Sequence, residues 1–390
     1  MRRHNLATLL RLVHFNGASS RAALTASTGL NRSTVKALVT ELAQLELVRE
    51  TNPAGTGAAG RPSIVVEPAS ERVFAVAVDL GADHLSAARV GLGGVVLDRR
   101  EVRLARGGQS VVQTVRRTAK LITGIVDAAP PRAHCVGVGV SVSGLVSTAG
   151  GAVRLAPNLG WRDVPFGKLL SDRIGQSLPV AIGNDADLGA MAEHIRGAAT
   201  GVADLLYLSG EVGLGGGIIL GGKPMVGTGG YAGEVGHMVV RQRGAPCRCG
   251  ARGCWETQVG EEAILRATKS PPGTSLADVL RAFEQGDHSA RTGIRQVGHW
   301  LGVGVANLVN ILNPQIVIFG GATREIYAAA EPYAQQTLAT ALTAPREQVR
   351  LALAALGNDS ALVGAAELAF VPLLENPVDR GAAVRTAATT

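Results

Sequence analysis

The sequence predicts an α/β body that follows a smaller, mostly helical N-terminal domain. From about residue 72 onward, continuous apolar strands alternate with helical stretches, which is typical of a sheet buried on both faces. The chain has 51 glycines and only 3% aromatic residues, as expected for many tight turns between strands and helices. The first 61 residues carry most of the net positive charge and follow a helical pattern instead. With 390 residues the chain is long enough for two or three domains of about 150 residues each.

Composition and hydropathy exclude a disordered or membrane-spanning chain. Hydrophobic residues make up 46% of the sequence, which is too many for intrinsic disorder. No apolar run approaches the roughly 18 to 20 residues that span a membrane. The N-terminal stretch "MRRHNLATLLRLVHF" has Arg11 and His14 inside its apolar run and no small-residue cleavage site. We therefore interpret it as an amphipathic helix rather than a signal peptide, and expect a cytoplasmic protein with no membrane partner.

The N-terminal segment is strongly basic. Residues 1–61 contain eight Lys and Arg residues against three Glu residues, so they hold five of the seven net positive charges. A basic terminal segment on a nearly neutral body is typical of a nucleic-acid-binding module. Charge alone does not distinguish such a module from a solvated basic face.

Two short helices joined by a glycine turn are predicted within this segment. In "SRAALTASTGLNRSTVKALVTELAQLELV" a helix begins at Ser19 or Ser20, and a break falls at Thr28-Gly29-Leu30. Asn31 then serves as the N-cap of the second helix. Apolar residues at steps of three and four form a stripe for the core along that helix. They are Val35, Leu38, Val39 and Leu42.

Polar and basic residues lie at the outward-facing N-terminal end of the second helix. They are Arg32, Ser33, Thr34 and Lys36. A helix-turn-helix presents this end to the major groove of double-stranded DNA. The following "LVRETNPAGTGAAGRPSIVVEP" fits two short strands around a wing, with Arg61 within reach of a minor groove or a phosphate. We therefore predict a winged helix-turn-helix; the alternative, a small helical dimerisation domain, explains neither the glycine turn nor the placement of charge.

The strands of the body end in polar residues. Apolar strands recur in "RVFAVAVDLG", "HCVGVGVSVSG", "LPVAIGNDA", "ADLLYLSG" and "PQIVIFGG", separated by helical stretches such as 109–128 and 289–312. In such sheets ligands bind at the carboxyl ends of the strands. The polar clusters at those ends are Asp79, Ser141 to Ser143, Asn184-Asp185 and Gly320-Gly321.

Three of the four cysteines lie close together in the sequence. Cys247, Cys249 and Cys254 follow His237 after ten residues or more. In a reducing compartment, clustered cysteines suggest a metal site before a disulfide. Inert buried cysteines rarely cluster with this spacing. The remaining one, Cys135, lies inside an apolar strand and is interpreted as a small core residue.

A series of motifs along the body points to one family. The motifs are "DLG", "LAPNLGW", "GNDADLGAMAEH", "GLGGGIILGG", "GYAGEVGH", "CRCGARGCWE" and "NLVNILNPQIVIFGG". In this order they closely resemble the ROK family, which groups sugar-responsive repressors with sugar kinases of actin-like fold. The resemblance covers residue 3 to about residue 372. A winged helix with "GRP" is the arrangement of the repressor branch, since the kinases lack that domain.

The resemblance implies a two-lobed, actin-like α/β body behind a winged-helix DNA-binding domain of residues 1–70. Residues 71–185 and 359–375 are expected to form a smaller lobe. Residues 186–358 are expected to form a larger lobe with a zinc loop and an oligomerisation surface. Residues 376–390 are expected to be a flexible tail.

The cysteine cluster supplies a complete ligand set for zinc. Three thiolates from Cys247, Cys249 and Cys254 and one nitrogen from His237 suit tetrahedral Zn²⁺. Glycines between the cysteines allow a tight loop. No ligand position is left for water, so the expected role of the metal is structural.

The resemblance also implies a sugar site. Glu234 and Glu256 would accept hydrogen bonds from hydroxyls, and His237 would face the sugar while ligating zinc. Asn158, Asn184 and Asp185 match the other sugar contacts of the family. Taken singly, Asn158 could be a turn residue and the Asn184-Asp185 pair only an N-cap. Their occurrence together with the zinc loop favours the sugar site.

The motifs for ATP depart from those of the kinases. Asp185 matches the kinases' catalytic base, but in "DLGADH" Asp83 stands where they have a hydroxyl. In "GEVGLGGG", Glu211 and Val212 stand where Gly and Thr are expected. Added acids repel a polyphosphate, and Val donates no hydrogen bond. We therefore expect that no residue of this chain acts in catalysis.

We therefore expect a sugar-responsive transcriptional regulator, a repressor of operator DNA with a sugar effector between its lobes. Sugar binding would favour one closure of the lobes and so change the placement of two winged helices in a homodimer or homotetramer. One alternative is an ATP-dependent sugar kinase with an added DNA-binding domain, and another is a regulator that no longer binds sugar. The sequence does not identify the sugar or the operator, and it does not show whether sugar weakens or strengthens DNA binding.

Overall fold

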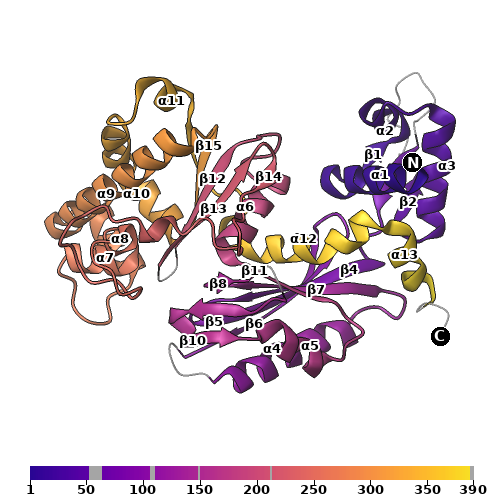
Figure 1. Cartoon of the computed structure of the whole chain (residues 1–390), viewed down its shortest axis with the longest axis horizontal. Coiled ribbons are helices and arrows are strands. Elements are labelled where there is room, and N and C mark those ends of the chain that lie inside the picture. The colour runs from indigo at the N-terminus through magenta and orange to yellow at the C-terminus, as the bar shows by residue number, and fades with distance from the viewer. Residues whose placement is uncertain (52–63, 106–109, 148–149, 211–212, 387–390) are drawn as a thin grey trace.

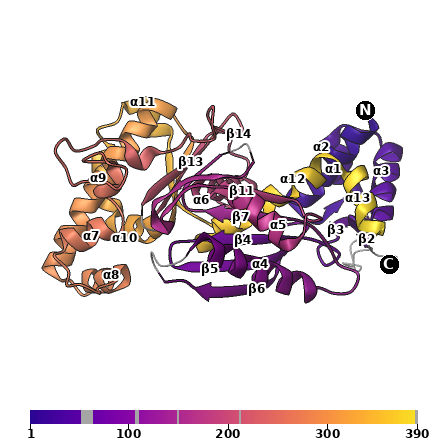
Figure 2. The ribbon, with the colours of Figure 1, turned by 60° about the horizontal axis from the view of Figure 1, so that its bottom comes forward.

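The computed structural model describes residues 1–51, 64–105, 110–147, 150–210 and 213–386. It divides into an N-terminal winged-helix domain, a smaller lobe and a larger lobe, arranged in that order along the molecule (Figure 1). A second view shows the winged-helix domain and the helices of the larger lobe at opposite ends (Figure 2). Among the described residues, no helix has the length and apolar character needed to cross a membrane.

The winged-helix domain has the predicted helix-turn-helix. Ser20 caps its second helix by accepting a hydrogen bond from the Ala23 amide, and Gly29 ends that helix in the left-handed conformation. The Asn31 side chain then caps the third helix through the Thr34 amide. The bounds are α1 Arg2–Asn16, β1 Ser19–Ser20, α2 Arg21–Thr28, α3 Arg32–Gln44, β2 Val48–Thr51 and β3 Val65–Pro68. β2 and β3 pair antiparallel as expected for a wing, while its expected tip, 52–63 with Arg61, lies outside the described residues.

The smaller lobe is built on a five-stranded sheet in the order β11-β7-β4-β5-β6. β4, β7 and β11 run parallel, with Asp79 paired to Ser141 and Ser141 paired to Gly183. The three carboxyl ends therefore meet at one edge, which brings three of the predicted polar clusters together. The bounds are β4 Val73–Leu80, β5 His84–Gly91, β6 Val96–Arg103, α4 Val111–Asp127, β7 His134–Val142, β8 Leu145–Val146, β9 Val153–Ala156, η1 Pro157–Leu159, β10 Trp161–Val164, α5 Phe166–Ile174 and β11 Val180–Asn184.

The larger lobe holds a second five-stranded sheet in the order β14-β13-β12-β15-β16. Its parallel core strands β12 and β15 place Ser209 beside Gly320 at their carboxyl ends. The bounds are α6 Asp185–Arg196, β12 Leu205–Gly210, β13 Leu214–Leu220, β14 Lys223–Pro224, η2 Val235–His237, η3 Trp255–Thr257, α7 Glu261–Ala267, α8 Leu276–Glu284, α9 His288–Leu312, β15 Ile316–Gly321, α10 Ala322–Leu338, α11 Thr343–Gln348, β16 Arg350–Leu353 and η4 Gly357–Asp359.

Two helices pack where the lobes meet, α6 and α12 (Ser360–Glu375). Their backbones approach closely at Gly364, where an added Cβ would lie 2.0 Å from the Leu188 carbonyl oxygen. α12 approaches β7 in the same way at Gly139, where a Cβ would lie 1.8 Å from the Ala365 carbonyl oxygen. Only glycine leaves room for such contacts, so these positions keep the two helices close to each other and to the sheet.

One apolar core joins the winged-helix domain to the smaller lobe. It includes Leu6, Leu10 and Val13 of α1 together with Val90 of β5 and Phe370 of α12. Because these buried side chains form a single cluster, the winged-helix domain is docked on the body rather than tethered to it.

The end of the chain differs from the expected flexible tail. Within 376–390, the structure has a helix, α13 (Pro377–Thr386), and residues 387–390 lie outside the described residues. Val378 packs against the shared core, and Asp379 pairs with Arg3 at 3.3 Å. An added Cβ on Gly381 would lie 3.2 Å from that of Leu45, which shows how closely α13 covers the winged-helix domain.

Candidate functional site

A cavity of about 280 Å³ lies between the lobes, and we call it the interlobe cavity. Cavities that bind small molecules begin at roughly this size, so it suits a ligand as small as a monosaccharide. All six side chains expected to contact sugar line it. They are Asn158, Asn184, Asp185, Glu234, His237 and Glu256. The structure therefore brings this set together from separate parts of the chain, with both lobes contributing.

Asp185 and Asn184 occupy the junction of β11 and α6. The Asp185 carboxylate accepts a 2.7 Å hydrogen bond from the Ser143 hydroxyl and one of 2.9 Å from the Ala186 amide. Burial raises the pKa of Asp185 to about 6. The nearby charge of Asp79 also raises this pKa, whereas the hydrogen bond from Ser143 lowers it. Such a carboxyl titrates near neutral pH.

Asn184 acts as an N-cap, which is the plainer role considered for it from the sequence. Its Oδ1 accepts from the Ala186 and Asp187 amides, and its Nδ2 donates to the Gly144 carbonyl. One amide hydrogen is left for a ligand, because Nδ2 carries two. Asn184 thus combines a structural role with a place in the cavity wall.

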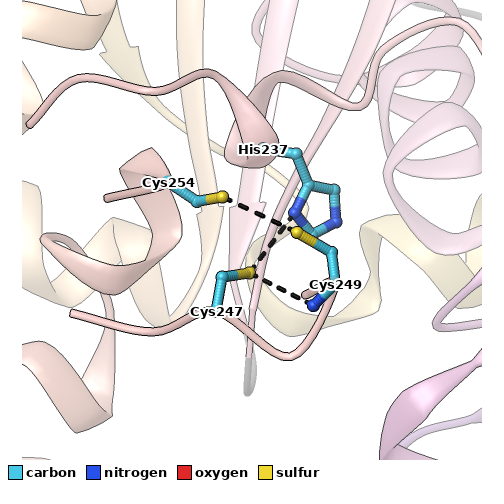
Figure 3. A group of neighbouring side chains, drawn as sticks. All are labelled: His237, Cys247, Cys249 and Cys254. Carbon is cyan, nitrogen blue, oxygen red and sulfur yellow. Dashed lines mark hydrogen bonds between the residues drawn. The ribbon is translucent and has the colours of Figure 1, made fainter. Parts of the chain in front are cut away.

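The four predicted metal ligands lie together at the edge of the interlobe cavity (Figure 3). One ligand atom from each of His237, Cys247, Cys249 and Cys254 falls within 4.8 Å of the others. The Cys249 and Cys254 sulfurs are 3.7 Å apart, as are the Cys247 sulfur and His237 Nδ1.

These separations fit a tetrahedral ion. Two sulfurs bound to zinc at about 2.3 Å lie about 3.8 Å apart at the tetrahedral angle. The loop closes through glycines at positive φ. At one of them, Gly253, an added Cβ would lie 1.8 Å from the Arg241 carbonyl oxygen, so the close approach of the two backbones requires glycine. The cluster is therefore compact enough to hold a metal ion.

The cluster also contacts the cavity wall directly. The Cys247 thiol donates to Glu256 Oε1 at 2.8 Å, and His237 Nε2 lies 3.6 Å from Glu234. Burial raises the pKa of Glu234, with a further contribution from Asp185. The loop that carries the predicted metal ligands therefore also positions the larger lobe's carboxylates.

Sequence reasoning gave no role in the site to three residues in or beside the interlobe cavity. Arg248, between two of the cysteines, donates to Asn158 Oδ1 at 2.8 Å and so joins the two lobes. Ser143 holds Asp185, as described above. Burial raises the pKa of Asp187 to about 7, with further contributions from Asp185 and Glu234. "SVSG" and "CRC" marked the neighbourhood of the first two, but no spacing rule predicted a contact across the cavity.

A second cavity, of about 750 Å³, adjoins the first and shares Asp185 and Ser209 with it. We call it the acidic hollow, because carboxyl side chains dominate its charged lining. The acids are Asp79, Asp83, Glu101, Asp185, Glu261 and Glu325, and the basic residues are His84, Arg99 and Arg103. Arg99 forms an ion pair with Asp359 at 2.6 Å, which weakens the electrostatic attraction of Arg99 for any other anion.

The turn after β4 is occupied by a histidine ring. His84 Nε2 lies 3.1 Å from Asp79, and its Nδ1 lies 3.4 Å from Asp83. The ring covers Gly81 so closely that an added Cβ there would lie 2.2 Å from it. Glu211 and Val212, the other departures from the kinase motifs, lie outside the described residues.

The residues predicted to contact DNA belong to a different surface. Arg32, Ser33 and Lys36 are exposed at the start of α3, and Thr34 is half-buried. Ser33 donates to Asn31 Oδ1 at 2.7 Å, so its hydroxyl also supports the N-cap. These residues belong to α3 of the winged-helix domain, which lies on the opposite side of the molecule from the helices of the larger lobe (Figure 1).

Comparison with known protein families identifies the family of this chain. Residues 75–371 match the sequence profile of the ROK family. The chain belongs to the ROK family. A xylose repressor from Caldicellulosiruptor bescii is 32% identical over 332 residues, which cover 81% of this chain and 82% of that protein. A glucokinase from Halalkalibacterium halodurans is 31% identical, over 78% of this chain and 97% of the glucokinase.

A solved structure of a ROK family transcriptional regulator, a homologue of the Escherichia coli MLC protein, has the same fold over the whole length. Its TM-score is 0.79 at 23% identity, and the match covers 100% of this chain and 99% of that one. The two-lobed α/β body with a winged-helix domain in front is therefore a ROK arrangement. Glucokinase, by contrast, is matched over nearly its full length by only part of this chain.

Proposed function

We propose that this ROK protein is a sugar-responsive transcriptional repressor. The winged-helix domain binds operator DNA, and a monosaccharide or sugar derivative binds in the interlobe cavity as effector. The observation that carries the proposal is the pairing of two cavities: one lined by a complete set of hydroxyl-binding side chains, the other by carboxylates. Similarity to xylose repressors supports the same assignment.

The interlobe cavity has the chemistry that a sugar requires. A pyranose presents neighbouring hydroxyls that need hydrogen-bond acceptors, and Asp185, Glu234 and Glu256 supply carboxylates around one space. Asn158 and Asp185 belong to the smaller lobe or its edge, while Glu234 and Glu256 belong to the larger lobe. A bound sugar would therefore contact both lobes and favour one closure of the cleft.

The metal is proposed to be one structural Zn²⁺ per chain, held by His237, Cys247, Cys249 and Cys254. Three sulfurs and one nitrogen fill a tetrahedral shell, which leaves no position for a reacting water. When bound, the ion would require the Cys247 thiol to lose its proton. The hydrogen bond from that thiol to Glu256 would then be absent, and Glu256 would be available to a hydroxyl.

On the winged-helix domain, Arg32, Ser33, Thr34 and Lys36 are proposed to face the major groove, with Arg61 supporting them from the wing. Their place at the start of an exposed helix supports this role, since recognition helices use their N-terminal residues. A homodimer or homotetramer would present two such helices to a two-fold operator.

A sugar kinase with an added DNA-binding domain is the second candidate. Its support is the Asp185 carboxyl, whose pKa near 6 would suit a base, and the similarity to glucokinases. Against it, a polyphosphate would meet the acids of the acidic hollow and the His84 ring over Gly81. We therefore do not assign catalysis to Asp185.

Operator binding with and without sugar tests the proposal. Candidate sugars are first screened by thermal shift, with xylose and glucose leading the panel because the relatives are named for them. Asp185→Ala and Glu256→Ala should each keep operator affinity in the absence of sugar and lose its response to the best ligand. If both variants respond as the wild type does, the effector site lies elsewhere.

A further inference from the structure

A buried cluster of polar groups joins the winged-helix domain to α6. The α1 residue His14 is fully buried, and its Nε2 lies 2.8 Å from Glu367 of α12. Arg196, the last residue of α6, donates to the other Glu367 oxygen at 2.6 Å. Its guanidinium also donates to the backbone carbonyls of Gly93, at 2.8 Å, and His14, at 3.3 Å. We call these side chains the His14–Glu367–Arg196 cluster.

The contacts of this cluster govern its charges. The Gly93 amide donates to His14 Nδ1 at 2.8 Å, so Nδ1 is an acceptor, while Nε2 lies 2.8 Å from Glu367 and 3.0 Å from the Arg196 guanidinium. Burial acts to raise the pKa of Glu367, but His14 and Arg196 lower it overall. The buried carboxylate and guanidinium thus neutralise each other, as a buried ion pair requires.

The chain also makes room for the cluster. Gly94, at positive φ, lies against the guanidinium so closely that an added Cβ would be 2.3 Å from Arg196 Cζ. The β5–β6 turn therefore accommodates Arg196 only because glycine occupies this position. Winged-helix domain, smaller lobe and α6 meet here at specific atoms rather than through apolar packing alone.

The other end of α6 lies in the interlobe cavity. Its N-cap Asn184 and first residue Asp185 line that cavity, and both bond to the β7–β8 turn through Gly144 and Ser143. From Asp185 to Arg196 the helix spans about 17 Å at 1.5 Å per residue. A ligand hydroxyl that takes the place of Ser143 at Asp185 Oδ2 would break this link between α6 and the smaller lobe.

The interior of α6 is firmly held along its length. Glu193, fully buried, accepts hydrogen bonds from the amides of Ala198, Ala355 and Leu356 and from the Ser360 hydroxyl. The close approach of Gly364 to Leu188 ties the helix to α12. α6 is therefore a firmly held element that runs continuously from the interlobe cavity to the His14–Glu367–Arg196 cluster, so a contiguous path joins the two.

We propose that Arg196 and His14 are positioning residues, which transmit the state of the interlobe cavity through α6 to the winged-helix domain. The inference rests on the proposed sugar response. When a sugar replaces Ser143 at Asp185, the N-terminal end of α6 changes its contact with the smaller lobe. At its other end Arg196 then changes the seating of α1, because His14 is bonded to the same carboxylate.

The test compares the sugar response of operator binding in the wild type and in Arg196→Gln/Glu367→Gln. The double variant removes both buried charges together, so neither is left unpaired. Sugar affinity, measured by calorimetry, and operator affinity without sugar should remain near wild type. The ratio of operator affinities with and without sugar, typically about 5- to 150-fold for a coupled protein, should fall toward 1.

The control is another Arg–Glu ion pair at the same domain junction, more exposed than Arg196–Glu367. Arg72 of the smaller lobe pairs with Glu46 of the winged-helix domain and also donates to the Arg132 carbonyl, and neither bond involves α6. Arg72→Gln/Glu46→Gln removes a similar tie and should keep the sugar response. If both double variants lose the response equally, general docking is responsible and the inference is wrong.

Two further outcomes are decisive. If the Arg196→Gln/Glu367→Gln protein retains the full response, α6 is not the route. If it does not fold, as judged by circular dichroism, Arg196→Lys carries the same expectation, because a lysine keeps the charge but has no planar fork to reach both Glu367 and Gly93. If the wild-type protein binds sugar but its operator affinity never changes, both this inference and the proposed sugar response are wrong. If the sugar response of operator binding survives in every variant, only this inference is wrong.

Discussion

The Ser143 hydroxyl donates a 2.7 Å hydrogen bond to Asp185, the carboxylate at the centre of the interlobe cavity. This bond favours the ionised carboxylate, whereas burial and the charge of Asp79 favour the protonated form, and the pKa comes to about 6. The smaller lobe therefore adjusts how readily this group accepts a hydrogen bond.

Sugar affinity should depend on pH. Only ionised Asp185 is a pure acceptor, so affinity should rise as pH rises through about 6 and level off roughly one pH unit above that value. At one pH unit below its pKa the group is about one-tenth ionised, so the expected loss approaches tenfold near pH 5. Ser143→Ala should move the midpoint to higher pH. Calorimetry from pH 5 to 8 measures both, and an affinity independent of pH would show that Asp185 does not bind the ligand in its ionised form.

Asp185→Asn should stabilise the ligand-free protein at neutral pH. The pKa of Asp185 is about 6 in the folded state and about 3.9 in an unfolded chain, so the folded state binds its proton more tightly and loses stability as pH rises between these values. Removing the charge should add about 1 to 3 kcal/mol to the free energy of unfolding at pH 7.5. Urea denaturation at pH 7.5 and 4.5 checks this, since the gain should shrink at the lower pH. A variant less stable than wild type at pH 7.5 would contradict the assigned cost of burial.

Operator binding should depend on the N-terminal end of α3. Arg32→Ala/Lys36→Ala should weaken it, by about 1 to 3 kcal/mol for each side chain that reads a base, with relaxed specificity. A side chain that binds only phosphate should, when removed, weaken binding to all sequences alike and flatten the salt dependence. Arg116→Ala/Arg117→Ala on α4 is the charge-matched control and should have no effect. Adding Arg61→Ala tests the wing, and a triple variant with wild-type affinity would contradict the docking.

Purified protein should contain one zinc ion per chain, and Cys249→Ser should lose it together with the sugar response. Without the metal, the Cys247 thiol keeps its proton and its hydrogen bond to Glu256, which removes an acceptor from the cavity. Cys135→Ser is the control, because that thiol lies in β7 and burial raises its pKa to about 11. Metal analysis of protein prepared without chelator measures the zinc. Operator binding without sugar should survive in both variants.

ATP should not be consumed in the presence of sugar. A coupled assay for ADP over hexoses, pentoses and N-acetylated amino sugars should give no signal above the sugar-free rate, because carboxylates line the acidic hollow. Sugar-dependent turnover that is abolished by Asp185→Asn would establish the kinase alternative instead.

The sequence was sufficient to predict the elements and most of the wall of the interlobe cavity. Cap residues such as Ser20 and Asn31 act locally, so the helix starts followed from neighbouring residues. Parallel strands bring their carboxyl ends to one edge, so Asp79 and Asn184 could be placed before the structure was known.

Contacts between distant segments could not be predicted in this way. The bond from Arg248 to Asn158 and the one from His14 to Glu367 join residues 90 and 353 positions apart, and no periodicity relates them. The helix at 377–386 was also missed. Its sequence carries no strong amphipathic pattern, and its place depends on the winged-helix surface that it covers.

The shared core also determines the order in which the molecule can mature on the ribosome. α1 is synthesised well before its partners in α12, since His14 and Glu367 are 353 positions apart in the chain and His14 also packs against Phe370. Domains that emerge early usually fold early, but this one cannot complete its packing until α12 has been synthesised. A chain that stops before α12 would therefore carry an undocked winged helix with its apolar face uncovered, so this domain reaches its final form only in a chain that includes α12.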